Sequence, residues 1–258
     1  MRPLSTTNRP TATIAHRGAS AYAPENTLTA IRQAVELHSD LVEVDVQRTR
    51  DGALVLAHDT ELGRTTDAAR MLPLRAPWRV SDLTLDEILR LDAGSWFSPA
   101  YAGERIPTLE QALDLLAISG TGLQLEVKQP ARYPGIATDV AAALRSRPRG
   151  PVIVQSFDHQ VMHDFARLGT GVPVGLLGHP PVRRLPALAT WASQVNPRHR
   201  KATASYVDAV HAAGMDCLVW TADREGDIRR ALAFGVDGVI TNRPDVLRRV
   251  LADWLVPA

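Results

Sequence analysis

The segment Leu41-Val42-Glu43-Val44-Asp45-Val46 has the β-branched, alternating pattern of a strand, with two acidic residues among the apolar ones. Residues two apart on a strand share a face, so the carboxylates of Glu43 and Asp45 point the same way. We expect this strand to be parallel and covered on both faces, and buried carboxylates are stable only when paired or bound to a cation. The segment therefore predicts a strand of a parallel sheet whose two carboxylates belong to a functional site.

The rest of the chain alternates short β-branched runs with amphipathic stretches, which predicts parallel strands connected by helices. Eight such units in about 250 residues are typical of a closed (β/α)₈ TIM barrel. An open doubly wound sheet fits less well, because no glycine-rich phosphate fingerprint follows the first strand. The expected strands are Thr13–Ala15, Leu41–Val46, Leu123–Val127, Val152–Gln155, Val174–Leu177, Gln194–Asn196, Cys217–Trp220 and Gly238–Thr241. The expected helices are Thr27–Leu37, Leu109–Ala117, Ile136–Leu144, Gln160–Leu168, Thr203–Ala213, Arg224–Phe234 and Pro244–Trp254.

One apolar run, Leu54 to His58, does not fit this alternation. Its connection to the second strand is too short for a helical crossover, so we expect it to turn back as a hairpin. The hairpin would carry His58 over the barrel mouth, where active sites of this fold form. The residues that follow, to Ile106, are irregular and rich in proline and aromatic side chains, which is typical of a lid or substrate wall. We therefore expect residues 1–258 to form one TIM-barrel catalytic domain, with an inserted hairpin and lid-like segment at about 48–106.

The composition excludes several partners. With 258 residues, 45% hydrophobic and 22% charged, the chain can bury a large core. Its formal net charge is +1, from 29 basic and 28 acidic residues, so we expect no nucleic acid and no anionic membrane as partner. The single cysteine, Cys217, excludes an internal disulfide and is compatible with a reducing compartment. Met1 to Pro10 lack the apolar run of a signal peptide, and no apolar stretch is long enough for a transmembrane segment, so we expect a cytoplasmic protein. The sequence does not indicate the oligomeric state.

Further polar residues fall at the carboxyl ends of the expected strands. His16 and Arg17 directly follow the first strand, and Glu126 and Lys128 share a face at the end of the third. Arginine binds phosphate oxygens through a planar fork of donors, histidine moves protons near neutral pH, and paired carboxylates hold a hard divalent cation. Together these residues indicate chemistry on a phosphate ester.

Each of these residues also has a structural interpretation. A Glu-x-Asp pair is more often a solvated strand face, and an acid beside a lysine can be a structural ion pair. A lone histidine can be a hydrogen-bonded or surface residue, and Trp220, an aromatic wall at the end of the seventh strand, is more often core. The set is more specific than its members, because functional residues of barrels gather at strand ends. Six histidines have no matching partners in the pattern: His38, His159, His163, His179, His199 and His211.

A series of different short motifs extends over nearly the whole chain. In order, they are Ile14-Ala15-His16-Arg17-Gly18, Pro24-Glu25-Asn26-Thr27, Glu43-Val44-Asp45-Val46, Asp51-Gly52, Val55-Leu56-Ala57-His58-Asp59, Glu126-Val127-Lys128, Gln155-Ser156-Phe157, Val219-Trp220-Thr221 and Gly235-Val236-Asp237-Gly238-Val239-Ile240-Thr241. Together they closely resemble the glycerophosphodiester phosphodiesterases. The resemblance implies a (β/α)₈ barrel with an insertion after the second strand. It also implies hydrolysis of glycerophosphodiesters to glycerol 3-phosphate and an alcohol, with Ca²⁺ or Mg²⁺ as the divalent metal ion.

The resemblance also assigns roles and exposes two departures. Asp223 stands where many relatives have Asn, and Asn242 stands where Asp usually follows the last Thr. The resemblance does not specify which of the two histidines is the acid and which is the base. By resemblance, His16 and His58 are the acid and base, Glu43, Asp45 and Glu126 are the metal ligands, Arg17 and Lys128 contact the phosphate, and Trp220 lines the site.

Several alternatives remain open at this stage. The nucleophile is either water or the substrate's neighbouring hydroxyl, acting through a cyclic phosphate. A phospholipase D-like enzyme acting on lysophospholipids or sphingomyelin would share the barrel, but its secreted forms carry disulfides and this chain has one cysteine. A non-catalytic barrel that binds phosphorylated metabolites would not need both histidines, and a sugar-phosphate isomerase would not need paired metal carboxylates. The head group is undetermined, because four aromatic residues of the insertion either hold choline by cation–π contact or pack against the barrel: Trp78, Trp96, Phe97 and Tyr101.

Overall fold

The computed structural model describes residues 10–146 and 150–254, and at its centre lies a closed barrel of parallel strands. The barrel strands are β1 (Ala12–His16), β2 (Leu41–Arg48), β4 (Gly122–Val127), β5 (Val152–Ser156), β6 (Val174–Leu177), β7 (Gln194–Asn196), β8 (Asp216–Val219) and β9 (Gly238–Thr241). Their order around the barrel is β1-β9-β8-β7-β6-β5-β4-β2, and pairing of β1 with β2 closes it. This confirms the TIM barrel predicted from the sequence.

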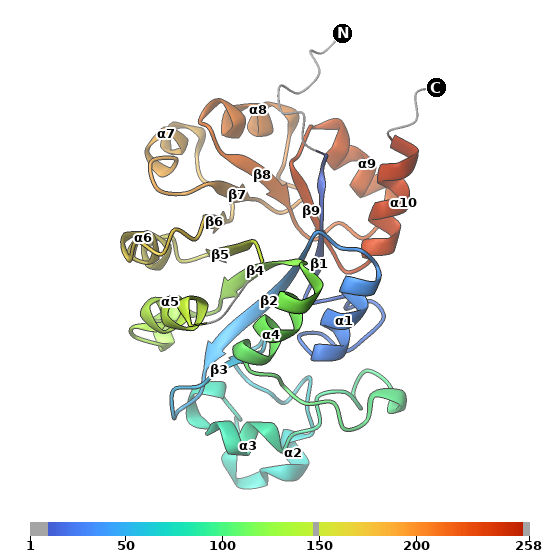
Figure 1. Cartoon of the computed structure of the whole chain (residues 1–258), viewed down its shortest axis with the longest axis vertical. Helices are drawn as coiled ribbons and strands as arrows, with labels where there is room; N and C mark the ends of the chain where they lie inside the picture. The colour runs from blue at the N-terminus through green and yellow to red at the C-terminus, as the bar shows by residue number, and fades with distance from the viewer. Residues whose placement is uncertain (1–9, 147–149, 255–258) are drawn as a thin grey trace.

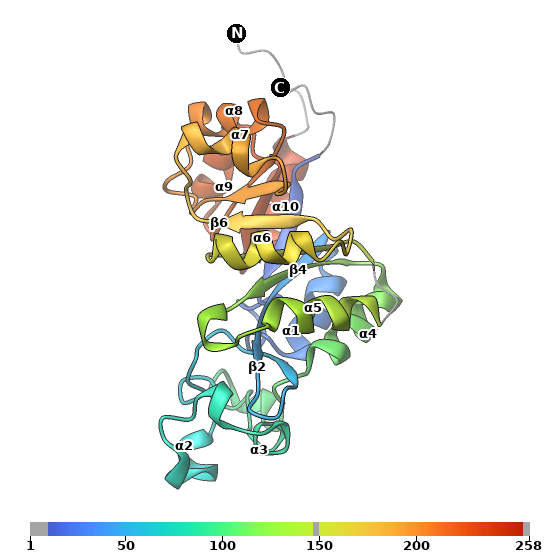
Figure 2. The same cartoon turned by 90° about the vertical axis from the view of Figure 1, so that its left-hand side faces the viewer.

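Helices connect successive strands and cover the outside of the barrel (Figures 1 and 2). The sequence predicted these helices and strands to within two residues at each end, apart from one four-residue helix. None of the helices within the described residues is long and apolar enough to cross a bilayer. The expectation that no signal peptide is present falls on Met1 to Arg9, outside the described residues. The helices are α1 (Leu28–Glu36), α4 (Leu109–Ser119), α5 (Ile136–Arg145), α6 (His159–Arg167), α7 (Leu185–Leu188), α8 (Ala204–Ala212), α9 (Glu225–Ala233) and α10 (Pro244–Trp254).

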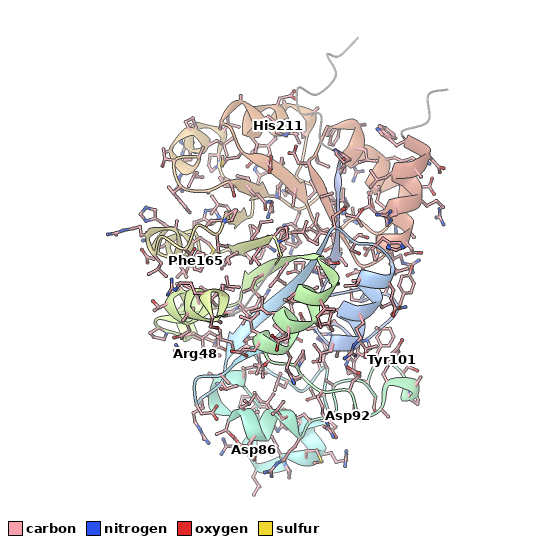
Figure 3. The ribbon with its side chains drawn as sticks, in the orientation of Figure 1. Arg48, Asp86, Asp92, Tyr101, Phe165 and His211 are labelled. Atoms are coloured by element: carbon pink, nitrogen blue, oxygen red, sulfur yellow. The ribbon has the colours of Figure 1, made fainter. Side chains whose placement is uncertain are left out.

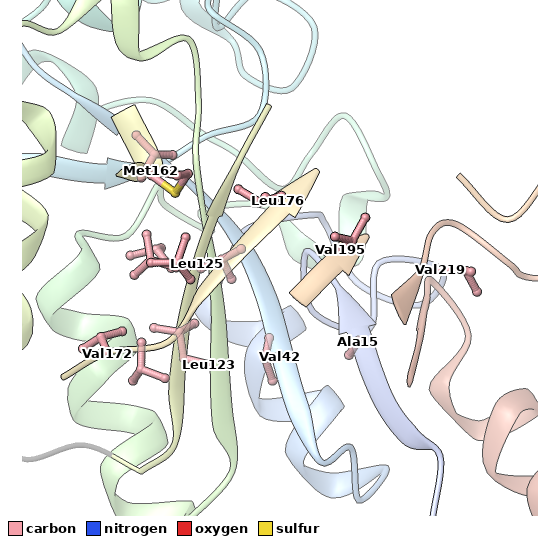
Figure 4. Packing of buried hydrophobic residues seen from close by; sticks show 14 of the residues in the cluster. Ala15, Val42, Leu123, Leu125, Met162, Val172, Leu176, Val195 and Val219 are labelled. Carbon is pink, nitrogen blue, oxygen red and sulfur yellow. The ribbon is translucent and has the colours of Figure 1, made fainter. Parts of the chain in front are cut away.

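The two faces of the barrel strands have different side chains. Apolar residues such as Val42, Leu123 and Leu125 pack in the main hydrophobic cluster between strands and helices (Figure 4). The alternate residues of β2 and β4 are polar, and they are buried as well. Because successive side chains of a barrel strand alternate between the outside and the inside, these polar residues point into the barrel. The carboxylates recognised in the sequence therefore face the interior.

Amide side chains fill the next layer of the interior toward the amino ends of the strands. Gln155 Oε1 accepts hydrogen bonds from Gln124 Nε2 (2.7 Å) and from Asn196 Nδ2 (2.8 Å). Gly175 on β6 leaves room for this network, since a Cβ at that position would lie 3.1 Å from Asn196 Nδ2. The barrel is thus packed below the carboxylates, and they are approached from the carboxyl-terminal rim.

The predicted hairpin after β2 is present. Strand β3 (Leu54–Leu56) pairs antiparallel with β2, with Leu56 opposite Val46. The segment that follows contains two short helices, α2 (Ala68–Met71) and α3 (Leu85–Leu89), and lies at one end of the molecule (Figures 1 and 2). It has a separate hydrophobic cluster: Val55, Ala57, Leu62, Ala68, Val80, Leu83, Ile88, Leu91, Ala93 and Ile106.

Three of the insertion's aromatic residues pack against one another and the barrel. The rings of Trp96 and Phe97, and those of Phe97 and Tyr101, meet edge to face with centroids 5.7 Å apart. The Tyr101 hydroxyl (Figure 3) donates to the carbonyl oxygen of Tyr22, in the loop before α1, at 2.7 Å. These contacts fasten the insertion to the barrel. Trp78 differs, because it lines a cavity together with His58.

Candidate active site

The carboxyl ends of β2 and β4 bring three acidic residues together. Glu43 and Asp45 lie on β2, and Glu126 is the register partner of Asp45 on β4. The ligand oxygens of the three carboxylates all lie within 4.8 Å of one another. Their exposed fractions are 2%, 1% and 8%, so all three are buried. Buried carboxylates this close repel one another unless a cation lies among them.

This crowding changes the pKa values of the three groups. Burial, and then the charges of Asp45 and Glu126, raise the pKa of Glu43 well above its ordinary value. Burial and the charge of Asp45 raise the pKa of Glu126 to about 7, against the opposing effect of Lys128. Burial alone would also raise the pKa of Asp45, but Lys128 and Arg17 outweigh it and hold that pKa below the ordinary range. The cluster therefore contains carboxyls that keep their protons unless further positive charge is supplied.

Two cationic side chains border the cluster. Lys128 Nζ lies 2.7 Å from Glu126 Oε1 and 3.6 Å from Asp45 Oδ1. Arg17 Nε lies 3.3 Å from Asp45 Oδ2, and the Arg17 backbone N–H donates to Glu43 at 3.0 Å. Arg17 adopts a left-handed backbone conformation (φ 56°), which turns the chain at the end of β1. Both cations are thus fixed beside the carboxylates.

The motif after the first strand contains a residue that holds Asp45 in place. Asn26 Nδ2 donates to Asp45 Oδ2 at 2.9 Å, and the backbone N–H of Asp45 donates to Asn26 Oδ1 at 3.1 Å. The neighbouring Glu25 accepts from Arg17 at 3.0 Å. Thr27 then caps the amino end of α1 by accepting from the backbone N–H of Ala30. The sequence analysis identified the motif Pro24-Glu25-Asn26-Thr27 but predicted no role for its residues.

His16 lies at the end of β1, next to the loop after β9. Its Nδ1 is 2.7 Å from Asn242 Oδ1. Burial, and then the positive charge of Arg17, lower the pKa of His16 to about 4. The ring is therefore neutral at pH 7. Sequence reasoning noted Asn242 only as a departure from a pattern and did not predict this contact.

His58 lies in the loop after β3. Its Nδ1 is 2.7 Å from Asp59 Oδ1, and Asp59 also accepts a hydrogen bond from Arg64. The side chain of Gln47, inside the barrel, donates to the carbonyl oxygens of Ala57 (2.8 Å) and Asp59 (2.7 Å). Gln47 thereby fixes the backbone on both sides of His58. A glutamine on the inner face of β2, two residues after Asp45, was the available sequence signal for this anchor.

Trp220 follows β8 and contributes less directly. Its ring meets Phe157 edge to face at 5.5 Å, its Nε1 donates to the Asn196 carbonyl oxygen, and Arg198 lies over its face at 4.9 Å. Phe157 is 52% exposed and lines a cavity that contains Glu126 and Lys128. Trp220 therefore supports the aromatic wall of this cavity through Phe157.

Three cavities are lined by predicted site residues. One of about 550 Å³ contains His58, Trp78 and Lys128, and one of about 520 Å³ contains Glu126, Lys128 and Phe157. A third, of about 350 Å³, contains His16, Arg17 and Asn242. Lys128 thus borders two of these cavities, and His16 and Arg17 border the third.

Comparisons with known proteins agree with this architecture. A model of the "Glycerophosphoryl diester phosphodiesterase family" matches residues 16–246. A glycerophosphodiester phosphodiesterase of Caldanaerobacter subterraneus is 36% identical over 242 residues, which cover 92% of this chain and 96% of that relative. One from Bacillus subtilis is 34% identical over 260 residues, covering 92% and 85%.

Solved structures give the same result. A phosphodiesterase of Oleispira antarctica, in complex with the product sn-glycerol-3-phosphate, is 28% identical with a TM-score of 0.82, covering 94% of this chain and 97% of that one. A glycerophosphodiester phosphodiesterase of Agrobacterium tumefaciens is 25% identical with a TM-score of 0.74, covering 93% and 99%. The extent of these matches, and the site at the barrel rim, show that the chain belongs to the glycerophosphoryl diester phosphodiesterase family.

Proposed function

We propose that this protein hydrolyses glycerophosphodiesters to glycerol 3-phosphate and an alcohol. The supporting observation is the convergence of three buried carboxylates, two cations and two histidines at one rim of the barrel. Family membership supports the same reaction. So does the Oleispira relative, whose structure contains glycerol 3-phosphate as product.

The acidic residues fit a divalent metal ion. Asp45 Oδ1 is buried without a hydrogen-bond partner, although Glu43 and Glu126 lie close by. Carboxylate oxygens favour hard cations, so we infer that Glu43, Asp45 and Glu126 hold Ca²⁺ or Mg²⁺. When bound, such an ion polarises a phosphoryl oxygen and offsets the negative charge that develops during attack at phosphorus.

The cationic side chains supply a second source of positive charge. Arg17 and Lys128 are held beside the carboxylates by the contacts described above. Donors fixed in advance stabilise charge that develops in the transition state without having to reorganise. We assign both residues to binding of the phosphate, and Trp220, through Phe157, to the wall of the substrate cavity.

The two histidines are suited to opposite proton transfers. His16 is neutral at pH 7, so its Nε2 can accept the proton of the nucleophile, either water or the neighbouring glycerol hydroxyl. His58 has the Asp59 carboxylate at Nδ1, which supplies a negative charge for the ring while it holds a proton. As the nucleophile bonds to phosphorus, His58 gives a proton from Nε2 to the departing alkoxide and the P–O bond to the alcohol breaks. If the nucleophile is the glycerol hydroxyl, water then opens the cyclic phosphate to glycerol 3-phosphate, with the two histidines in exchanged roles. We therefore assign His16 as the base and His58 as the acid.

A substrate panel tests this proposal. Purified enzyme is incubated with glycerophosphocholine, glycerophosphoethanolamine and bis(glycero)phosphate, each with Ca²⁺, Mg²⁺ or EDTA, and glycerol 3-phosphate is measured. We expect release with at least one metal and none with chelator. Absence of glycerol 3-phosphate under every condition contradicts the proposal. Phosphorus NMR of quenched samples distinguishes the nucleophiles, because only attack by the glycerol hydroxyl produces a cyclic phosphate.

The remaining proposals concern the domain organisation, the cellular location and the binding partner. We propose that barrel and insertion act as one catalytic domain, supported by the contacts from Tyr101 to Tyr22 and from Arg64 to Glu25. We also propose a cytoplasmic location, supported by a single, buried cysteine, Cys217. The partner that we expect is a small-molecule diester rather than a nucleic acid, given the net charge of +1.

A further inference from the structure

A chain of hydrogen bonds leads from Asp223 to the His16 ring through Asn242. His16 ends β1, Asn242 directly follows β9, and the two strands are neighbours in the barrel (Figure 1). Asn242 Oδ1 lies 2.7 Å from His16 Nδ1. On its other side, Asn242 Nδ2 donates to Asp223 Oδ2 at 2.7 Å, and the Asn242 backbone N–H donates to Asp223 Oδ1 at 2.7 Å.

The chemistry of these groups fixes the direction of the chain. An ionised carboxylate only accepts hydrogen bonds, so Asp223 requires the amide nitrogen of Asn242 to face it. The amide oxygen is then turned toward His16. Because that oxygen cannot donate, the proton of the neutral ring must lie on Nδ1. His16 Nε2 is left with its lone pair.

The surrounding loop holds this arrangement in place. Thr241 Oγ1 donates to Asp223 Oδ1 at 3.0 Å, and the Ala21 backbone N–H donates to the Asn242 carbonyl oxygen at 3.1 Å. The hydroxyl of Ser20 lies 2.7 Å from both Asn242 Oδ1 and the His16 carbonyl oxygen. Across residues 10–146 and 150–254, Asn242 is the only hydrogen-bond partner of the His16 ring. The ring therefore depends on one amide for its tautomer.

We propose that Asn242 is a positioning residue that holds His16 in its Nδ1-protonated tautomer, and that Asp223 orients the Asn242 amide for this task. The role in catalysis rests on the proposed function, in which His16 Nε2 accepts the proton of the nucleophile. A ring with the other tautomer would have its lone pair on Nδ1, facing away from that task. Fixing the tautomer in the resting enzyme removes the need to select it in each turnover.

Asp223 and Asn242 form one pair of a carboxylate and an amide. The two side chains are hydrogen-bonded to each other, and the neutral amide is the one that touches His16. The pair should therefore be mutated together as well as singly.

NMR of the His16 ring tests the tautomer directly. In ¹⁵N-histidine-labelled protein, with the His16 signals assigned by comparison with His16→Gln, we expect the Nδ1-protonated pattern in the wild type. Asn242→Ala should give a mixture of tautomers, because the ring loses its acceptor. It should also lower kcat on the order of tenfold, with a smaller change in KM, since a base rather than a binding contact is affected. An unchanged tautomer in Asn242→Ala overturns the proposal.

The exchanged double variant provides the second test. Asn242→Asp alone places two carboxylates in contact, and Asp223→Asn alone frees the Asn242 amide to flip, so each should lower kcat. Asp223→Asn with Asn242→Asp restores one amide and one carboxylate, and the new carboxylate still accepts from His16 Nδ1. We expect kcat of the double variant to exceed that of either single variant. Multiplicative losses in the double variant overturn the proposal. This comparison decides the question even when Asn242→Ala does not fold.

Tyr22→Phe is the matched control. The Tyr22 hydroxyl donates to Asp245 in the same region but does not touch His16. We expect this variant to keep the wild-type tautomer and kcat, and a loss as large as that of Asn242→Ala would contradict a specific role for Asn242. The NMR experiment also separates the two proposals. If the wild type releases no glycerol 3-phosphate, the proposed function fails, while the wild-type and Asn242→Ala spectra still decide whether Asn242 sets the tautomer.

Discussion

At the scale of single residues, each histidine of the site is held at Nδ1 by an oxygen atom, which leaves Nε2 available. We expect His16→Ala and His58→Ala each to lower kcat by about 10²-fold or more, the usual effect of removing a general acid or base. The measurement is release of glycerol 3-phosphate by purified, folded variants. His38→Asn serves as control, because His38 is exposed with φ 55°, a conformation that asparagine tolerates. Near-normal turnover of either site variant removes that histidine from the mechanism.

The buried carboxylates make a different prediction at the same scale. Glu43→Gln and Asp45→Asn should raise the metal concentration needed for half-maximal activity, because each variant lacks one charged oxygen ligand. The measurement is a titration of Mg²⁺ or Ca²⁺ into chelator-treated enzyme. Glu36→Gln, at an exposed position on α1, should titrate like the wild type. An unchanged metal requirement in both site variants argues against a ligand role.

Sequence reasoning predicted the charged residues of the site better than the neutral ones. Glu43 and Asp45 were recognisable because two acids on a covered strand are costly without a purpose. The pattern places Gln47 on the inner face of its strand but indicates no partner for it or for Asn242, since neutral amides are common and their partners depend on the final register. Asn242 meets His16 across 226 positions of sequence, a contact that arises because the first barrel strand, β1, pairs with the last, β9.

At the scale of elements, the insertion depends on a close approach at Gly94. A Cβ at this position would lie 1.9 Å from the carbonyl oxygen of Tyr101, so the loop segments that contain Gly94 and Tyr101 must separate to accept a side chain. Asp92 (Figure 3) joins the same two segments by accepting from the backbone N–H groups of Gly94 and Gly103. We expect Gly94→Ala to destabilise the protein by about 1–3 kcal/mol, measured by denaturant unfolding.

Gly226 provides the comparison for Gly94. It lies in α9, and a Cβ there would meet nothing within 4 Å. Gly226→Ala should therefore leave stability unchanged or raise it by up to about 1 kcal/mol, as for glycine to alanine in a helix. Equal destabilisation by both substitutions would mean that the contact between Gly94 and Tyr101 is unimportant.

The barrel strands and the long helices were predictable, whereas helices of about one turn were not. The long helices have apolar repeats that extend over the whole element, and the strands were recognisable as short runs that alternate with these helices. Helix α7 (Leu185–Leu188) is about one turn long, so it contains too few residues for a period to appear. The same is true of α2 and α3 in the insertion. Their positions are set by tertiary packing in the separate hydrophobic cluster of the insertion.

At the scale of the whole molecule, the metal site should link stability to pH. The pKa of Glu126 is raised to about 7, so this group retains its proton in the folded enzyme but not in the unfolded chain between about pH 4.5 and 7. Without metal, its contribution is favourable at low pH and is lost as the pH rises through 7. A metal ion requires the ionised form, so the rise in Tm on adding Mg²⁺ or Ca²⁺ should be larger at pH 8 than at pH 5.

Glu126→Gln isolates this effect. The lowered pKa of His16 works in the opposite direction, because it makes stability rise with pH between about 4 and 6.5. Since His16 is present in both proteins, the difference in Tm between wild type and Glu126→Gln reports the carboxyl. In chelator, we expect the wild type to lose stability relative to the variant as the pH rises. A constant difference from pH 5 to pH 8 would contradict the link.

The separate hydrophobic cluster of the insertion has a consequence for evolution. Residues such as Leu62, Val80 and Ile88 pack with one another instead of joining the cluster around the barrel. Substitutions at these three positions should therefore disturb the packing around β2 and β4 less than substitutions in the main cluster would. The outer part of the insertion can accordingly vary in sequence while the three carboxylates keep their positions on β2 and β4.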